Sequence, residues 1–210
     1  MKFYDCATAP SPRRVRIFLA EKGVTVDTVQ VDLRNGEQFT PAFRAINPDC
    51  TVPALVLDDG IVIADAVAIC QYIEELHPDP PLVGATPQER AMVNALNRQI
   101  ERDGFFAAMD AFRNAAKGLV GRALPGPHDY AQIPELAERG RARLENFFKG
   151  MNARLADREF VAGERYTIAD ISTTVLTDMA NGMVKLAIPG ECANLRRWYS
   201  AVSARPSAKA

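Results

Sequence analysis

The sequence predicts an α/β domain followed by an all-helical domain. Segments with strand and helix periods alternate over residues 1–80, and only helical periodicity follows. The proline-rich run His77-Pro78-Asp79-Pro80-Pro81 separates the two patterns, which is a domain-boundary signal. With 210 residues and 48% hydrophobic composition, the chain can bury a substantial core and could form one domain or two small ones. We therefore expect two domains, at residues 1–80 and 88–210.

The first elements of the N-terminal half are a strand, a helix and a second strand. Lys2–Cys6 is a short strand candidate, and a proline-rich turn follows it. An apolar stripe at helical spacing over residues 15–19 ends at Gly23, a residue that suits the end of a helix because it takes positive φ readily. Apolar residues over 29–33 then alternate with polar ones, as in a half-buried strand.

A short helix, a hairpin and a longer helix complete this half. Thr40-Pro41 matches an N-cap followed by proline at the first helical position. Val52-Pro53 leads into a strand, and the Asp59-Gly60 turn joins it to a second one. A helix then begins at Asp65 and runs to Leu76, so the predicted order is β-α-β-α-β-β-α.

Apolar stripes at helical spacing and a helix-start motif mark the C-terminal half. Thr167-Ile168-Ala169-Asp170 matches a capping box, with Tyr166 and Ile171 placed for the accompanying hydrophobic contact. Segment 116–132, rich in glycine and proline, is a loop between helices. The stripes consist of Val93, Leu96 and Ile100, of Leu144, Phe147, Phe148, Met151 and Leu155, and of Leu195, Trp198 and Val202.

Charge and cysteine content argue against several kinds of partner. The net charge is −1 with both signs interspersed, so neither nucleic acid nor an anionic membrane is favoured. The N-terminus lacks the pattern of a signal peptide, and no apolar run is long enough to span a bilayer, so we expect a cytoplasmic protein. No metal site is expected, because the cysteines, Cys6, Cys50, Cys70 and Cys192, lack ligand spacing and should be reduced and buried.

The stretch from Asn47 to Ile69 predicts a binding site for a small acidic peptide. A valine before proline presents its backbone N–H and C=O to an extended chain, and the Val52–Pro53 bond can be cis at modest cost. A helix beginning at Asp65 offers free N–H groups and a partial positive charge to a carboxylate. A free backbone edge beside a helix N-terminus that can bind an anion suits such a peptide.

Four motifs lie in register along the chain: the helix Pro12–Gly23, Phe43-Arg44-Ala45-Ile46-Asn47-Pro48, Val52-Pro53-Ala54-Leu55 and Thr167-Ile168-Ala169-Asp170. Together they resemble those of the cytosolic glutathione S-transferases, most closely the zeta-like and other bacterial classes. The resemblance covers nearly the whole chain. It implies a thioredoxin-like N-terminal domain that binds glutathione as a substrate, and a helical domain that lines the pocket for a hydrophobic electrophile. It also implies a homodimer with a role in detoxification.

The resemblance assigns five residues to glutathione. Val52 and a cis Pro53 would bond its cysteinyl backbone, and Gln38, fourteen residues earlier, would reach its glycine end. Asp65, a favoured N-cap, would accept the γ-glutamyl ammonium. Ala66 stands where the family usually has serine, so only its backbone N–H remains for the γ-glutamyl carboxylate. Hydrogen bonds to charged groups contribute roughly 1.5–3 kcal/mol, so this loss would weaken binding roughly ten- to hundredfold unless compensated.

The group that serves the thiol should lie in the loop entering the first helix. A free thiol has a pKa of about 8.5, so the enzyme must supply donors near the sulfur. The family's serine or cysteine falls on Ala9, which has no donor; Ser11 is the best available hydroxyl, with Thr8 behind it. Ser11 followed by Pro12 also matches an N-cap with proline at the first helical position. Tyr4 is interpreted as a packing residue.

Other residues of the two halves have less specific assignments. Arg13, Arg14 and Arg16 are interpreted as a solvated helix face rather than as a device for steering the tripeptide. The resemblance places a group of side chains where the helical domain meets the electrophile, with only one or two of them facing it. They are Phe105, Phe106, Met109, Phe112 and Arg113.

Two alternative functions stay open. One is a glutathione-dependent isomerase or disulfide reductase, since this fold hosts several reactions. The other is a non-catalytic binding protein of the same fold, suggested by the missing donor at Ala9 and the missing hydroxyl at Ala66.

Overall fold

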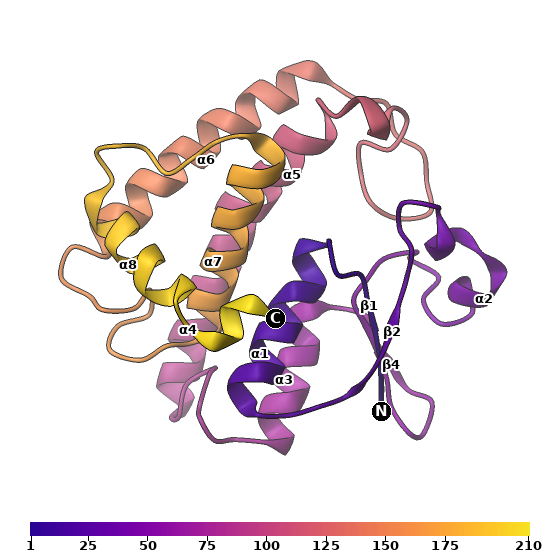
Figure 1. Cartoon of the computed structure of the whole chain (residues 1–210), viewed down its shortest axis with the longest axis horizontal. Helices are drawn as coiled ribbons and strands as arrows, with labels where there is room; N and C mark the ends of the chain where they lie inside the picture. Colours follow the sequence, from indigo (N-terminus) through magenta and orange to yellow (C-terminus); the bar gives the residue numbers. More distant parts are fainter. The chain divides into compact units, whose positions relative to one another are not determined.

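The computed structural model describes all residues, 1–210, and divides into two compact units. The first unit comprises Met1–Pro80 together with Pro125–His128 and the terminal Ala210. The second comprises Pro81–Leu124 and Asp129–Lys209. Figure 1 shows the chain coloured from indigo at the N-terminus to yellow at the C-terminus.

A four-stranded mixed sheet forms the centre of the first unit, in the order β2-β1-β3-β4. The central strand β1 pairs in parallel with β2 and antiparallel with β3, and β4 pairs antiparallel with β3 at the edge. The register sets Phe3 of β1 opposite Thr28 of β2 and Leu55 of β3. The strands are β1 Lys2–Asp5, β2 Asp27–Gln30, β3 Ala54–Val56 and β4 Val62–Ile63.

Helices cover both faces of this sheet. Helices α1 and α3 pack side by side (Figure 1), joined by a buried ion pair of 2.6 Å between Lys22 and Glu74. On the other face, the ring of Tyr4 meets the ring of Phe43 in α2 edge to face, which confirms the packing role expected for Tyr4. The helices are α1 Pro10–Lys22, α2 Pro41–Arg44 and α3 Ala66–Leu76.

The predicted element order of the N-terminal half is confirmed, and so are three helix boundaries. Gly23 ends α1 with a φ of 64°, and the Val24 N–H donates back to the Leu19 carbonyl over 3.0 Å. Thr40 caps α2 by accepting from the Phe43 N–H. Asp65 caps α3, as described below.

Two expectations about this half are wrong in detail. Helix α1 starts at Pro10 with Ala9 as the N-cap residue, so Ser11 is not an N-cap and lies inside the first turn. Both Pro10 and Pro12 suit a first turn, and the longer helix keeps both within it. The strand expected over 29–33 ends at Gln30, because the carboxylate of Asp32 accepts from the Arg34 and Asn35 N–H groups and turns the chain.

The second unit is built from helices, with α7 at its centre. Helices α4 and α5 are joined without a break by a π-helical turn, Glu101–Phe105. Because no proline marks this junction, the sequence did not indicate where one helix ends and the next begins. All residues of α7 except Asp178 are buried, as expected of a helix surrounded by protein. The helices are α4 Pro87–Ile100, α5 Phe106–Arg113, α6 Pro134–Arg154, α7 Ile168–Met179 and α8 Ala193–Ser203.

The capping box at the start of α7 is confirmed. The Asp170 carboxylate accepts from the N–H groups of Val161 and Thr167, over 2.8 and 3.0 Å, and from the indole N–H of Trp198 over 2.9 Å. Burial raises the pKa of Asp170 to about 6 despite these donors. The three apolar stripes predicted for this half are buried throughout, so they are core faces.

All four cysteines are free and buried, and their burial agrees with the expected packing role. Burial raises the pKa of the Cys70 thiol, which suits a packing role. No set of three or more His, Cys, Asp or Glu side chains is grouped as a metal site would need. None of the helices combines the length and the apolar character needed to cross a membrane.

Candidate functional site

Three segments of the first unit converge at one end of its sheet. The β1–β3 register pairs Tyr4 with Ala54, and its continuation brings Cys6 level with Val52. The β3–β4 register pairs Leu55 with Ile63, and its continuation brings Pro53 level with Asp65. The loop into α1, the Val-Pro step and the N-terminus of α3 therefore meet at the end of the sheet where β1 finishes.

The Val52-Pro53 step presents a free backbone edge. The peptide bond between these residues is cis, as expected. Strand pairing on β3 begins at Ala54, and none of the turn and loop hydrogen bonds involves Val52. Val52 is half-buried, so its N–H and C=O lie at the surface of the convergence point without an internal partner. A peptide backbone could bond both groups as an added strand would.

Asp65 combines a helix cap with an unused carboxylate oxygen. Its Oδ1 accepts from the N–H groups of Val67 and Ala68, over 2.9 and 2.8 Å. Its Oδ2 takes no part in the cap, and the residue is exposed. The Ala66 side chain is buried at 2% exposure, so the surface of this helix N-terminus is backbone and the Asp65 carboxylate. Such a surface can hold an ammonium at the carboxylate and an anion at the N–H groups.

Gln38 lies outside the convergence of the strands, in a short 3₁₀ turn, Glu37–Phe39. Its side-chain Oε1 is buried and has no hydrogen-bond partner within the chain. An unsatisfied buried acceptor calls for a donor from elsewhere, since leaving it unpaired is costly. The structure thus gives Gln38 an unused buried acceptor.

In the first turn of α1, the free hydrogen-bond donors belong to Ser11. Pro10 and Pro12 have no N–H, and the Arg13 N–H donates to the Ala9 carbonyl over 3.4 Å. The N–H and the hydroxyl of Ser11 are what this turn has left to offer a ligand, and the residue is half-buried. Thr8 is exposed, and its hydroxyl lies 3.5 Å from the sulfur of Cys6.

The interpretation of the helix α1 arginines as a solvated face is wrong for two of the three. Arg14 is buried, with 6% of its surface exposed. Arg16 pairs with the buried carboxylate of Asp5 over 2.5 Å, and also donates to the backbone of the loop before α1. The spacing of the arginines along the helix gave no sign of the Arg16 contacts, because these lie on β1 and on the loop before α1.

The predicted second-substrate residues lie in the second unit, around the π-helical turn. Phe105 is buried at 6% exposure, whereas Met109 and Phe112 are half-buried. The neighbouring Phe106 is 55% exposed. On burial alone, Met109 and Phe112 are better placed than Phe105 to meet a ligand.

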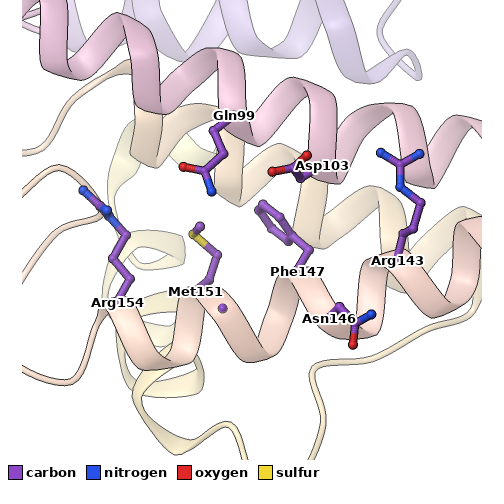
Figure 2. A pocket seen from close by; sticks show the side chains of 8 residues that line it. Gln99, Asp103, Arg143, Asn146, Phe147, Met151 and Arg154 are labelled. Atoms are coloured by element: carbon purple, nitrogen blue, oxygen red, sulfur yellow. The ribbon is translucent and has the colours of Figure 1, made fainter.

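A separate cavity of about 360 Å³ lies on the second unit between α4 with its π-helical turn and α6 (Figure 2). Two of its polar groups are engaged within the protein: Arg154 donates to the Val161 carbonyl, and Asp103 pairs with Arg102. None of the predicted second-substrate residues lines it. The lining includes Gln99, Asp103, Arg143, Phe147, Met151 and Arg154.

Sequence reasoning missed two features of the first unit. Gln30, at the end of β2, holds the loop before α1 through its side chain, and only the strand register reveals that it lies beside this loop. Pro125–His128, placed by sequence in a loop of the helical half, belongs to the first unit. No local signal marks either feature, since both depend on contacts between distant segments.

Comparisons with known proteins agree on one family. Residues 8–76 match the family model described as "Glutathione S-transferase, N-terminal domain", and residues 109–206 match "Glutathione S-transferase, C-terminal domain". Glutathione S-transferase 2 of Saccharomyces cerevisiae is 36% identical over 214 residues, which cover 100% of this chain and 88% of the relative. A maleylacetoacetate isomerase of Pseudomonas aeruginosa is 41% identical over 93 residues, only 43% of this chain and 44% of that protein.

Solved structures confirm the fold class expected from the sequence. A glutathione S-transferase domain-containing protein of Marinobacter aquaeolei superposes with a TM-score of 0.91 at 40% identity, over 99% of each chain. Gtt2 of Saccharomyces cerevisiae superposes with a TM-score of 0.90 at 37% identity, over 100% of this chain and 99% of the other. Both agree with a thioredoxin-like domain followed by a helical one.

Proposed function

The chain belongs to the glutathione S-transferase family, and on this premise we propose how its residues hold glutathione and serve its thiol. It is an enzyme that binds glutathione and promotes attack of the glutathione thiolate on a hydrophobic electrophile. The observation that carries the assignment of residues is the convergence of the loop into α1, the Val52-Pro53 step and the Asp65 cap at one end of the sheet.

Glutathione lies extended along Val52 in this proposal. The Val52 N–H and C=O bond its cysteinyl residue, and the cis Pro53 holds Val52 in the required orientation. The γ-glutamyl ammonium meets Oδ2 of Asp65, while its carboxylate is held by the N–H of Ala66 at the N-terminus of α3. Gln38 receives a donor from the glycine end, which supplies a partner for its buried Oε1. Each contact uses a group that the chain itself leaves free.

The thiol is served by the first turn of α1. The hydroxyl of Ser11, assisted by its N–H, donates to the developing thiolate, and Thr8 is the second hydroxyl of the loop. The partial positive charge at a helix N-terminus lowers the thiol pKa further. Binding then supplies proximity to the electrophile.

The remaining assignments concern the second substrate and the cellular setting. Phe105, Met109 and Phe112 line the electrophile pocket, with Met109 and Phe112 carrying most of the contact because they are less buried. We further propose a cytoplasmic homodimer that acts in detoxification, uses glutathione as a substrate and needs no metal. These proposals follow from the family resemblance.

Titration of bound glutathione tests the thiol assignment. Calorimetry should first show glutathione binding at or below millimolar concentration; its absence there would favour a non-catalytic binding protein. The ultraviolet absorbance of the thiolate, followed against pH, should then give a pKa below the free value of about 8.5. Ser11→Ala should raise this pKa, and Thr28→Val, which removes an exposed hydroxyl on β2, should leave it unchanged. An unchanged titration in Ser11→Ala, with glutathione still bound, would exclude Ser11 from the role.

A glutathione-dependent isomerase is the second candidate function. The similarity to a maleylacetoacetate isomerase over 93 residues is the observation that favours it. Turnover of a maleyl-type substrate without measurable conjugation of an aromatic electrophile would support the isomerase. Conjugation without isomerisation would support the transferase.

A further inference from the structure

The peptide groups of Ala7, just before the thiol-serving turn, are held from both sides by side chains. The Ala7 N–H donates to Oε1 of Gln30 over 2.9 Å. The Ala7 carbonyl accepts from Nη2 of Arg16 over 3.0 Å, and Nη1 of the same guanidinium lies 3.4 Å from the Cys6 carbonyl. Ala7 itself is exposed and contributes no side chain beyond a methyl group.

Both holding side chains are fixed in turn by one buried carboxylate. Asp5, 1% exposed, accepts from Arg16 at Oδ1 over 2.5 Å and from Gln30 at Oδ2 over 2.7 Å. Asp5, Arg16, Ala7 and Gln30 therefore form a closed ring of hydrogen bonds, which we term the Ala7 clamp. Its members come from β1, α1, the loop between them and β2.

The clamp fixes the part of the loop that a ligand would otherwise have to order. Loops are mobile unless their backbone groups are bonded, and donors that stabilise a developing charge work best when they are already in place. Thr8 follows Ala7 directly, and Ser11 lies three residues further on, in the first turn of α1. Since the Asp5 carboxylate neutralises Arg16, the clamp acts through geometry more than through an unbalanced charge.

We propose that Arg16 and Gln30, oriented by Asp5, are positioning residues that hold the thiol-serving loop in its working conformation. This inference rests on the proposed function, because it presumes that the Thr8–Ser11 segment meets the glutathione sulfur. The anchoring contacts for glutathione, at Val52 and Asp65, belong to other segments. Loosening the clamp therefore alters the placement of the donors at the sulfur and leaves the peptide held.

The clamp is tested with variants that keep its surroundings. Gln30→Met has a side chain of similar length and removes both hydrogen bonds of Gln30 without changing charge. Arg16→Lys keeps the charge beside Asp5, but a single ammonium does not reproduce the two-pronged guanidinium contact with Asp5 and Ala7. Thr28→Val is the matched control, two residues before Gln30 on the same strand and outside the site.

The expected readout is a split between kcat and KM. In Gln30→Met and Arg16→Lys, kcat for conjugation should fall about tenfold, while KM for glutathione changes by less than about twofold. The pKa of the bound thiol should rise toward its free value in both variants and stay unchanged in Thr28→Val. Variants with the unmodified kcat and thiol pKa would overturn the clamp. So would variants in which KM alone rises.

The same titration separates this inference from the proposed function. If the unmodified chain binds glutathione without lowering the thiol pKa, the proposed thiol-serving turn is wrong and the clamp falls with it. If the unmodified chain lowers the pKa and both clamp variants do so equally, the proposed function stands and the clamp is wrong. If Gln30→Met unfolds at a lower temperature than the unmodified chain, the test uses Arg16→Lys instead. Arg16→Lys is then measured at a temperature below its own unfolding transition, and the same criteria decide the outcome.

Discussion

Gly140 marks the closest approach of two helices in the second unit, and its replacement should destabilise the protein. Gly140 lies on α6, facing α5. A Cβ atom at this position would stand 2.6 Å from the Ala107 carbonyl oxygen and 2.6 Å from the Ala111 nitrogen. Both are backbone atoms of a packed helix, so no rotamer change can relieve the contact. Gly140→Ala must push α5 and α6 apart.

The size of the effect follows from two opposing terms. Overpacking of this kind costs typically about 1–3 kcal/mol, and contact with rigid backbone on both sides puts Gly140→Ala at the upper end. Replacing a helical glycine by alanine returns about 1 kcal/mol. The net loss in free energy of unfolding should therefore be about 2 kcal/mol. Gly150, exposed on the same helix with no atom within 4 Å of an added Cβ, should instead gain up to about 1 kcal/mol as alanine.

Urea unfolding followed by circular dichroism measures both variants against the unmodified chain. Their free energies of unfolding should differ from each other by about 3 kcal/mol, with opposite signs relative to the unmodified chain. Gly140→Ala with unchanged stability would mean that α5 and α6 are not in the contact described, and the reasoning would fail. Destabilisation by Gly150→Ala of the same size would show that helical glycines on α6 matter for another reason.

Three further variants test the capping box and the proposed glutathione-binding residues. In Asp170→Asn the free energy of unfolding should vary less with pH than in the unmodified chain. The raised folded-state pKa, about 6 against 3.8, means that protonation stabilises the folded chain, and about 3 kcal/mol of that stabilisation is lost as the pH rises from 3.8 to 6. If the free energy of unfolding of Asp170→Asn and of the unmodified chain varied equally with pH, the raised pKa of the buried Asp170 carboxyl would be contradicted. Asp65→Asn keeps a good N-cap but loses the charge, so calorimetry should show about tenfold weaker glutathione binding at an unchanged melting temperature. Equal affinity would remove Asp65 from the ammonium site. Ala66→Ser restores a hydroxyl and should tighten binding up to about tenfold, whereas no gain would place the γ-glutamyl carboxylate elsewhere.

Local signals in the sequence located most helix boundaries correctly. The caps at Thr40, Asp65 and Thr167 are bonds between residues two or three apart, so a short motif contains all the atoms that make them. Gly23 is equally local, because only the backbone angle of one residue is at stake. The start of α1 was mistaken because two prolines offer two helix starts, and a serine between them resembles a cap.

Side chains whose partners lie on other elements were not predictable in the same way. Arg16 has the helical spacing of a solvated face, yet it reaches Asp5 at the end of β1. Gln30 has the spacing of a polar residue that alternates with apolar ones in a half-buried strand, yet its side chain bonds the loop before α1. Neither partner is within helical or strand spacing, so periodicity carries no information about them.

By itself, the sequence determined the two-part architecture, the order of elements in the N-terminal half and the positions of the Val52-Pro53 step and the Asp65 cap. These depend on periodicity, on proline chemistry and on caps, all of which act over a few residues. Only the tertiary structure decided that Cys6, Val52 and Asp65 meet at one end of the sheet, and that the Ala7 clamp holds the loop between β1 and α1. The physical reason is that strand register and buried hydrogen bonds join residues far apart along the chain, and their pairing is settled only when the whole unit packs.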